Sequence, residues 1–399
     1  MRATVIATLV AAGLVSHEAA AQPQILAPQA SSRFWPSVQK VCDQTAAAKP
    51  NELATKIAQT ALDEHYRFGG HQIDSNGRLF RFGLVESEQE EEASGGEAQL
   101  GHLGWWQVLK YWRTLYGTNP KVAARLRVWG YEEASASRNE DKDGAPDKDR
   151  APMHDEAAMA DRTTISVADL IRLGAQTKNP DTVELLRETA FRSAIVDNPW
   201  SAAFVSYAVK TAALGEQANP SEAQSFAKSR FPFSAAHRDY ILAAFKTSIA
   251  DAAAGKASTK DGHLYRACPV YTTEPRVGDL ICYHRERELK DSSDATVRDI
   301  IMADARAGRP ETVISQNHCD VVVHVDREAL KVYVVGGNVA QSVTVKKLRL
   351  RRDMKFAENR SGCGDWTLPP PSAGVPAGPS LRDGCSLNEK KWFVLLQMR

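Results

Sequence analysis

The hydrophobic period of this chain changes from mainly helical to mainly strand-like along its length, and this change constrains the fold more than any other feature. Apolar residues recur at helical spacing at 51–69, 105–115, 163–196 and 200–214. Beyond residue 278, short β-branched runs bounded by Gly, Asn or Asp predict strands at 279–283, 321–325, 331–335 and 342–348. A helical pattern returns only at about 294–307. Helices followed by strands favour an α+β fold over a doubly wound sheet.

The overall charge argues against partners that bind by long-range attraction to a charged surface. The chain has 50 basic and 49 acidic residues and a formal net charge of +1. Such a balance creates no field that attracts nucleic acid or an anionic membrane. We expect no nucleic-acid partner, and the function must be inferred from a site.

The N-terminus has the three parts of a secretory signal. Arg2 precedes an apolar run at 3–15, and three alanines at 19–21 stand before Gln22. The apolar run is shorter than the roughly 20 residues that span a bilayer, and no later segment reaches that length without charges. The sequence predicts a signal peptide over 1–21 and a mature, exported chain without a transmembrane segment, either periplasmic or extracellular.

The six cysteines suit an oxidising compartment, where an even count predicts three disulfides. Because no C-x-x-C pair exists, a cysteine-rich zinc site is not expected, and we expect neither a metal nor a cofactor. Cys363 and Cys385 bracket a Pro- and Gly-rich loop that has little else to hold it, so we expect them to pair. The remaining connectivity is open.

Changes in composition divide the chain into four parts. They are a signal peptide (1–21), an N-terminal tether (22–50), a main domain (51–350) and a disulfide-stapled C-terminal extension (351–399). Within the main domain, 132–162 holds almost no large apolar side chains and is expected to be a disordered insertion. A second insertion, at 284–316, lies between strands.

Ser201 is the candidate nucleophile. Pro199 suits the first position of a helix, which places Ser201 in the first helical turn. There its hydroxyl lies among backbone N–H groups that lack helical partners and that can stabilise an oxyanion. A serine at this position also suits a capping role.

His318 and Asn338 are the candidate partners of this serine. Strand alternation places His318 and Asp320 on one face, and Cys319 on the other. Asn338 follows two glycines at the end of the next predicted strand. A nucleophile, a base and an orienting amide form the generalised catalytic triad. A buried structural histidine and a hairpin-turn asparagine explain the same residues.

Four blocks of sequence resemble the NlpC and CHAP branch of papain-like amidases and peptidases. They are PWSAAFVSY, VGDLICY, HCDVVVHV and VVGGNVAQSV. Together with FPFSAAHRDYI, the blocks PWSAAF, GDLIC, HCDVVV and GGNV also resemble a bacterial family known as domain of unknown function 2272. The resemblance covers about 51–118 and 190–350, and it implies a papain-like NlpC/CHAP-type domain with helices packed on an antiparallel sheet.

This resemblance assigns roles to the site residues. The peptidases have cysteine where this chain has Ser201, so His318 would have to take the serine proton during attack while Asn338 orients the imidazole. The candidate substrate-binding residues are Trp200, His237 and Asp320, although His237 is equally suited to a helical packing face. Because the strands that carry them are neighbours in the family's sheet, Cys282 and Cys319 are expected to form a disulfide.

The resemblance implies an exported cell-envelope hydrolase that cleaves an amide bond in peptidoglycan peptides by acyl transfer. Its expected partner is a cell-wall peptide. One alternative is an inactive envelope-binding module, in which the change from cysteine to serine marks lost chemistry. Another is an esterase or lipid acyl hydrolase, which a serine nucleophile suits well.

Overall fold

A computed structural model describes residues 34–46, 49–87, 104–128, 180–257, 262–289, 291–308, 314, 316–358 and 386–399. These residues form nine α-helices, one short 3-10 helix, η2 (Arg287–Leu289), and one eight-stranded sheet. The fold is a mixed α+β fold, as the order of hydrophobic periods predicts. None of the described helices is both long and apolar enough to cross a membrane.

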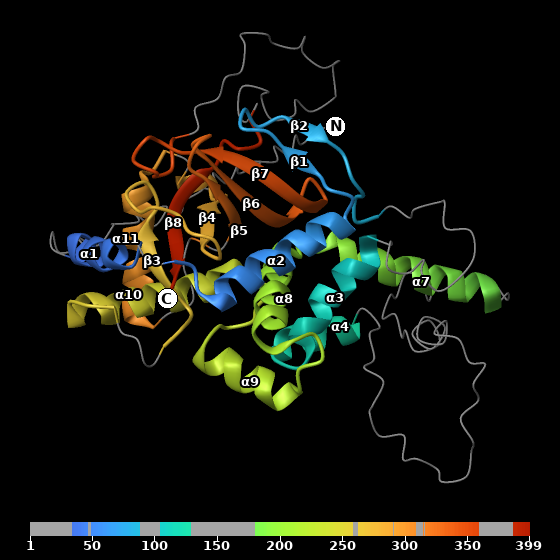
Figure 1. Cartoon of the computed structure of the whole chain (residues 1–399). Helices are drawn as coiled ribbons and strands as arrows, with labels where there is room; N and C mark the ends of the chain where they lie inside the picture. The colour runs from blue at the N-terminus through green and yellow to red at the C-terminus, as the bar shows by residue number, and fades with distance from the viewer. Residues whose placement is uncertain are drawn as a thin grey trace, which may run out of the picture.

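The helices fall into an inner group that contacts the sheet and an outer group that packs on other helices (Figure 1). The inner helices are α1 (Phe34–Ala46), α2 (Glu52–Arg67), α8 (Ser201–Leu214), α10 (His237–Ala254) and α11 (Asp294–Ala307). The outer helices are α3 (Gly104–Tyr116), α4 (Pro120–Val128), α7 (Pro180–Asp197) and α9 (Pro220–Ser229). Helix α8 is the central helix, because it packs against α2, α3, β5 and β6 at once.

The sheet has the order β2-β1-β7-β6-β5-β4-β8-β3. Its strands are β1 (Gln72–Ile73), β2 (Leu79–Arg81), β3 (Tyr265–Pro269), β4 (Leu280–His284), β5 (Asn317–Asp326), β6 (Lys331–Val339), β7 (Ser342–Arg349) and β8 (Lys391–Met398). Neighbours pair antiparallel except β1 and β7, which run parallel. The predicted strands at 279–283, 321–325, 331–335 and 342–348 correspond to β4, β5, β6 and β7.

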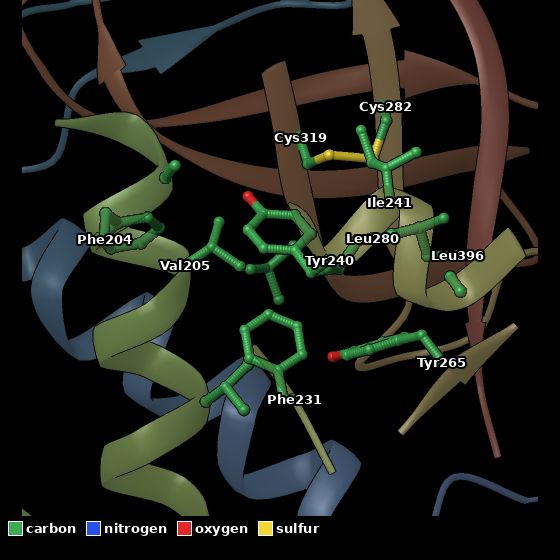
Figure 2. Close-up of a cluster of buried hydrophobic side chains, with 14 of the residues drawn as sticks. Phe204, Val205, Phe231, Tyr240, Ile241, Tyr265, Leu280, Cys282, Cys319 and Leu396 are labelled. Carbon is green, nitrogen blue, oxygen red and sulfur yellow. A yellow bond between two sulfur atoms is a disulfide. The ribbon is translucent and has the colours of Figure 1, made fainter. Parts of the chain in front are cut away.

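The main core lies between the inner helices and one face of the sheet. Figure 2 shows Val205 of α8 pointing toward Tyr240 of α10, with the Cys282–Cys319 disulfide beside them. Phe231 stacks on Tyr240, with ring centroids 5.0 Å apart. A smaller apolar cluster covers the opposite face of the sheet.

Three parts of the chain that composition marks as a tether, an extension and an insertion pack into the main fold. The tether contains α1, which packs on α10 and is tied to β3 by a disulfide between Cys42 and Cys268. The C-terminal extension contributes β8, which pairs with β3 and β4 inside the sheet. The insertion at 284–316 contains α11, which packs on α10 and β8. In each case an apolar segment between polar stretches supplies the surface that packs.

The expected Cys282–Cys319 disulfide is present and joins β4 to β5. Cys363, Cys385, the signal peptide and the insertion at 132–162 lie outside the described residues.

Candidate functional site

Ser201 is the first residue of α8, and its hydroxyl contacts an imidazole. The Oγ atom lies 2.7 Å from Nε2 of His237. The N-cap residue, Trp200, makes no side-chain capping bond to the N–H groups of the first turn. Ser201 is 8% exposed and His237 is 4% exposed. The hydroxyl therefore lies at the positive end of a helix and within reach of a base.

His237 is held against Ser201 by the segment that leads into α10. Ser206 of α8 donates a hydrogen bond to the carbonyl of Ser234, and the Ser234 N–H donates back to Ser206 Oγ, both at 3.0 Å. Ser234 Oγ in turn donates to Asp239 at 2.5 Å. These bonds tie the segment before α10, and the first turn of α10, to α8 beside the contact between Ser201 and His237.

The second nitrogen of His237 is also occupied. Its Nδ1 atom makes a hydrogen bond with the hydroxyl of Tyr240, one turn further along α10. When Nδ1 carries the proton, its N–H donates a hydrogen bond to the Tyr240 oxygen, and Nε2 accepts a hydrogen bond from the Ser201 hydroxyl. This tautomer is the one that general-base catalysis requires.

A second buried group consists of His318, Asp320 and Lys346. His318 Nε2 lies 3.0 Å from Asp320 Oδ1, and Lys346 Nζ lies 2.5 Å from Asp320 Oδ2. All three side chains are at most 1% exposed. His318 and Asp320 lie on one face of β5, opposite the disulfide-bonded Cys319, as strand alternation predicts.

A glycine in β6 makes room for this ion pair. Strand β6 lies between β5 and β7, so Lys346 must reach across β6 to meet Asp320. A Cβ atom on Gly336 would lie 2.0 Å from Asp320 Oδ1 and 3.1 Å from His318 Nε2. Only a residue without a side chain fits here.

Burial determines the protonation of both imidazoles. It lowers the pKa of His237 well below its ordinary value, and the neighbouring His318 and Arg285 lower it further. Burial also lowers the pKa of His318 to about 4, although Asp320 opposes this effect. For Asp320, burial would raise the pKa, but Lys346 and His318 together hold it below its usual value. At neutral pH both imidazoles are uncharged and Asp320 is a carboxylate.

The two groups form one cluster. The ring centroids of His237 and His318 are 5.1 Å apart, and Tyr283 lies 5.1 Å from His318 on another side. Arg285 Nη2 lies 3.4 Å from His318 Nδ1, which makes Nδ1 the acceptor and leaves the proton on Nε2 to bond Asp320. Thus the structure brings together Ser201, His237, His318 and Asp320, but the partner of Ser201 is His237.

Asn338 occupies a different position from the one expected for an orienting amide. It lies at the irregular end of β6 with a φ of 54°, beside the β6–β7 turn. Among the described residues, the hydrogen-bond partners of the His318 ring are Asp320 and Arg285. Asp320 thus has the orienting contact that the sequence analysis assigned to Asn338.

Trp200 and Asp320 are buried, whereas we expected both to contact a substrate. Trp200 is fully buried, stacks on Phe68 and donates its indole N–H to Glu86. Asp320 is fully buried in its pair with His318 and Lys346. Neither presents surface to a ligand.

Sequence reasoning missed Tyr240, Lys346 and Arg285. Tyr240 follows His237 by three residues, which is the spacing of neighbours on a helix face. Lys346 lies in β7, a strand of mixed apolar, hydroxyl and basic residues, and it is buried there. The sequence pattern does not show this burial, from which an acidic partner would follow. Among the described residues, no group of three or more His, Cys, Asp or Glu side chains is arranged to hold a metal ion.

Comparison with known proteins places the chain in a family. A family model described as "Uncharacterized protein conserved in bacteria (DUF2272)" matches residues 174–398, which is more than half of the chain. The match includes Ser201, His237, His318 and Lys346. No curated protein and no solved structure matches the chain. Because the match covers more than half of the chain, the chain belongs to the bacterial DUF2272 family.

Proposed function

We propose that this protein is an exported hydrolase that uses Ser201 as the nucleophile of acyl transfer and His237 as its general base. The observation that carries the proposal is the 2.7 Å contact between Ser201 Oγ and His237 Nε2 at the start of a helix. A serine, a neutral imidazole in hydrogen-bond contact and free N–H groups are the three parts that acyl transfer needs.

The proposed reaction has two steps. Ser201 Oγ bonds to the substrate carbonyl carbon while its proton passes to Nε2 of His237, and the first-turn N–H groups of α8 stabilise the oxyanion. Collapse expels the leaving group, which takes the proton from His237 and leaves an acyl-serine. A water molecule, deprotonated by His237, then hydrolyses this ester and restores Ser201.

We propose His237 as the base in place of His318 because of the hydrogen-bond partners of the two imidazoles. An alkanol has a pKa roughly seven units above that of a thiol, so Ser201 needs a base in direct contact. His237 Nε2 meets this condition, whereas His318 Nε2 bonds Asp320. We assign His318, Asp320 and Lys346 a positioning role, in which His318 lies against the ring of His237.

Export and substrate class rest on the sequence. The predicted signal peptide and the two disulfides of the described residues support an exported protein. The resemblance to NlpC and CHAP enzymes supports an amide bond of peptidoglycan peptides as the substrate. A serine nucleophile also suits ester and lipid acyl substrates.

A second candidate function is an inactive binding module. The observation that favours it is burial, since Ser201 and His237 expose only 8% and 4% of their surface. A substrate carbonyl must reach Oγ, so a hydrolase needs this region to open.

Release of peptides from purified sacculi tests the proposed function. We expect the wild type to release soluble muropeptides and Ser201→Ala to release none, while both keep the same melting temperature to within a few degrees. Ser225→Ala, an exposed serine on α9, is the matched control and should be as active as the wild type. If sacculi remain intact while ester substrates are hydrolysed in a Ser201-dependent manner, the enzyme is an esterase. If neither substrate is turned over, the binding module is the better account.

A further inference from the structure

A pocket on the far side of α8 from the sheet has an unusual charge. It has a volume of about 470 Å³ and lies between α3, α8 and α9. Three basic side chains line it: Lys110 and Arg113 of α3 and Lys210 of α8. The only acidic side chain of its lining is Glu216. Two positive charges are therefore unbalanced here, in a chain whose formal net charge is only +1.

The pocket's basic groups make no direct ion pair with a carboxylate of the described residues. Among the described residues, neither Arg113 nor Lys210 has an ion pair or hydrogen bond to a carboxylate. Lys110 donates to the neutral Gln107 at 2.8 Å. With one carboxylate among three basic groups in the lining, positive charges that remain uncompensated repel one another, which favours a bound anion.

The nearby carboxylates are already engaged. Glu216 accepts a hydrogen bond from Tyr207 at 2.7 Å. Glu64, behind Tyr207, is paired with Arg67 and also accepts from Tyr111. Burial lowers the pKa of Lys110 and of Lys210, although Glu64 opposes this for Lys110 and Glu216 opposes it for both. Arg113 adds to the lowering of both. An anion between the three basic groups would offset this cost.

A second pocket continues the basic surface. It has a volume of about 570 Å³ and shares Gly117 and Thr118 with the first. Its charged lining residues are Arg127 and Lys228, with no acidic residue. The two pockets together can hold an elongated molecule with acidic groups at separate points.

We infer that the pocket between α3, α8 and α9 binds a small anion with two acidic groups, phosphate or carboxylate, through Lys110, Arg113 and Lys210. The site is separate from Ser201, because Lys210 lies nine residues further along α8, or roughly 14 Å along the helix axis. The inference does not depend on whether Ser201 is catalytic.

Calorimetric titration of the full chain with two probes tests this inference. Pyrophosphate represents the phosphate source and glutarate the dicarboxylate source, each at low and high salt. We expect at least one probe to bind with a dissociation constant in the millimolar range or tighter, and binding to weaken as salt rises. The better probe identifies the chemistry of the acidic groups.

Matched variants locate the binding. Lys210→Met and Arg113→Met should each weaken the better probe by about tenfold or more, because each removes one of three positive charges. Lys246→Met, an exposed lysine of α10 away from the pocket, should leave binding unchanged. Absence of binding by both probes, or equal weakening by Lys246→Met, would overturn the inference. Unchanged melting temperatures of the variants show that the fold is intact.

Discussion

The sequence indicates Ser201 and His318 as candidate site residues, but it does not indicate which side chains they contact. Helix-start signals at 197–201 place the serine correctly in the first turn of α8. Strand alternation places His318 beside Asp320. The partner of Ser201 is set by the loop that brings α10 to α8, and no local pattern encodes that approach. The sequence alone therefore indicates a substrate-binding or packing role for His237.

The buried state of His318 predicts a pH dependence of stability. Its pKa falls from 6.5, the ordinary value, to about 4 in the folded protein because burial disfavours the charged ring. The unfolded chain thus binds the proton more readily. The free energy of unfolding contributed by His318 is fully present above pH 6.5 and is lost as the pH falls through about 4.

A variant isolates this contribution. Between pH 7.5 and pH 5, the wild type should lose ~2 kcal/mol more stability than His318→Gln loses over the same interval. Asp279, whose pKa burial raises to about 7, contributes with the opposite sign, but it is common to both proteins. Calorimetric unfolding of both proteins at the two pH values gives the difference. Equal losses would show that His318 is not held neutral by the fold.

At the scale of elements, β6 is the strand on which the polar cluster depends. Its Gly336 leaves the space through which Lys346 of β7 meets Asp320 of β5. Gly337, the next residue, makes similar room on the other face, where a Cβ would lie 2.6 Å from Phe204 of α8. Two adjacent glycines thus let a central strand lie close to an ion pair on one side and a helix on the other.

Gly336→Ala should therefore destabilise the protein. The new methyl group collides with the Asp320 carboxylate, and overpacking of this kind costs about 1–3 kcal/mol. The melting temperature should drop by several degrees. Gly117→Ala is the matched control, since its Cβ would meet only the Pro220 side chain at 3.8 Å. If both variants melt like the wild type, the cluster does not need the space at Gly336.

The strands differ in how far their sequences predict them. Strands β4 to β7 have short β-branched runs with turn residues at their ends, and these patterns indicate them directly. Strand β8, with the sequence KWFVLLQM, is nearly continuous in apolar residues because both of its faces are covered. A continuous run carries no period that separates strand from helix. Its place between β4 and β3 depends on contacts distant in sequence.

At the scale of the whole molecule, the family match is smaller than the folded unit. The match begins at residue 174, yet α1, α2 and α3 contribute to the same core as α8 and the sheet. Helix α2 packs on α8 and on β5. The disulfide between Cys42 and Cys268 adds a covalent link from α1 to the sheet.

A fragment of residues 174–399 should therefore fail to fold. It would expose the faces of α8 and the sheet that α2 and α3 cover, and it would lack one half of the Cys42–Cys268 disulfide. We expect no cooperative thermal transition by circular dichroism, whereas a chain that begins at Gln22 should show one. A fragment that melts cooperatively near the temperature of the longer chain would contradict this account of the core.

The two disulfides should contribute unequally to stability. Their sequence separations are 226 residues for Cys42–Cys268 and 37 for Cys282–Cys319. In the chain-entropy model, the longer loop stabilises the folded state by about 1.5 kcal/mol more. Replacing Cys42 and Cys268 by Ala should lower the melting temperature more than replacing Cys282 and Cys319. The reverse order would show that packing around the β4–β5 disulfide outweighs loop length.

Covalent labelling tests whether Ser201 is a nucleophile activated by His237. Intact-protein mass spectrometry after reaction with a fluorophosphonate should show one adduct on the wild type and on Ser225→Ala. We expect no adduct on Ser201→Ala and strongly slowed labelling of His237→Ala, with all four proteins folded by circular dichroism. A folded wild type that gains no adduct, or labelling that persists in Ser201→Ala, would contradict it.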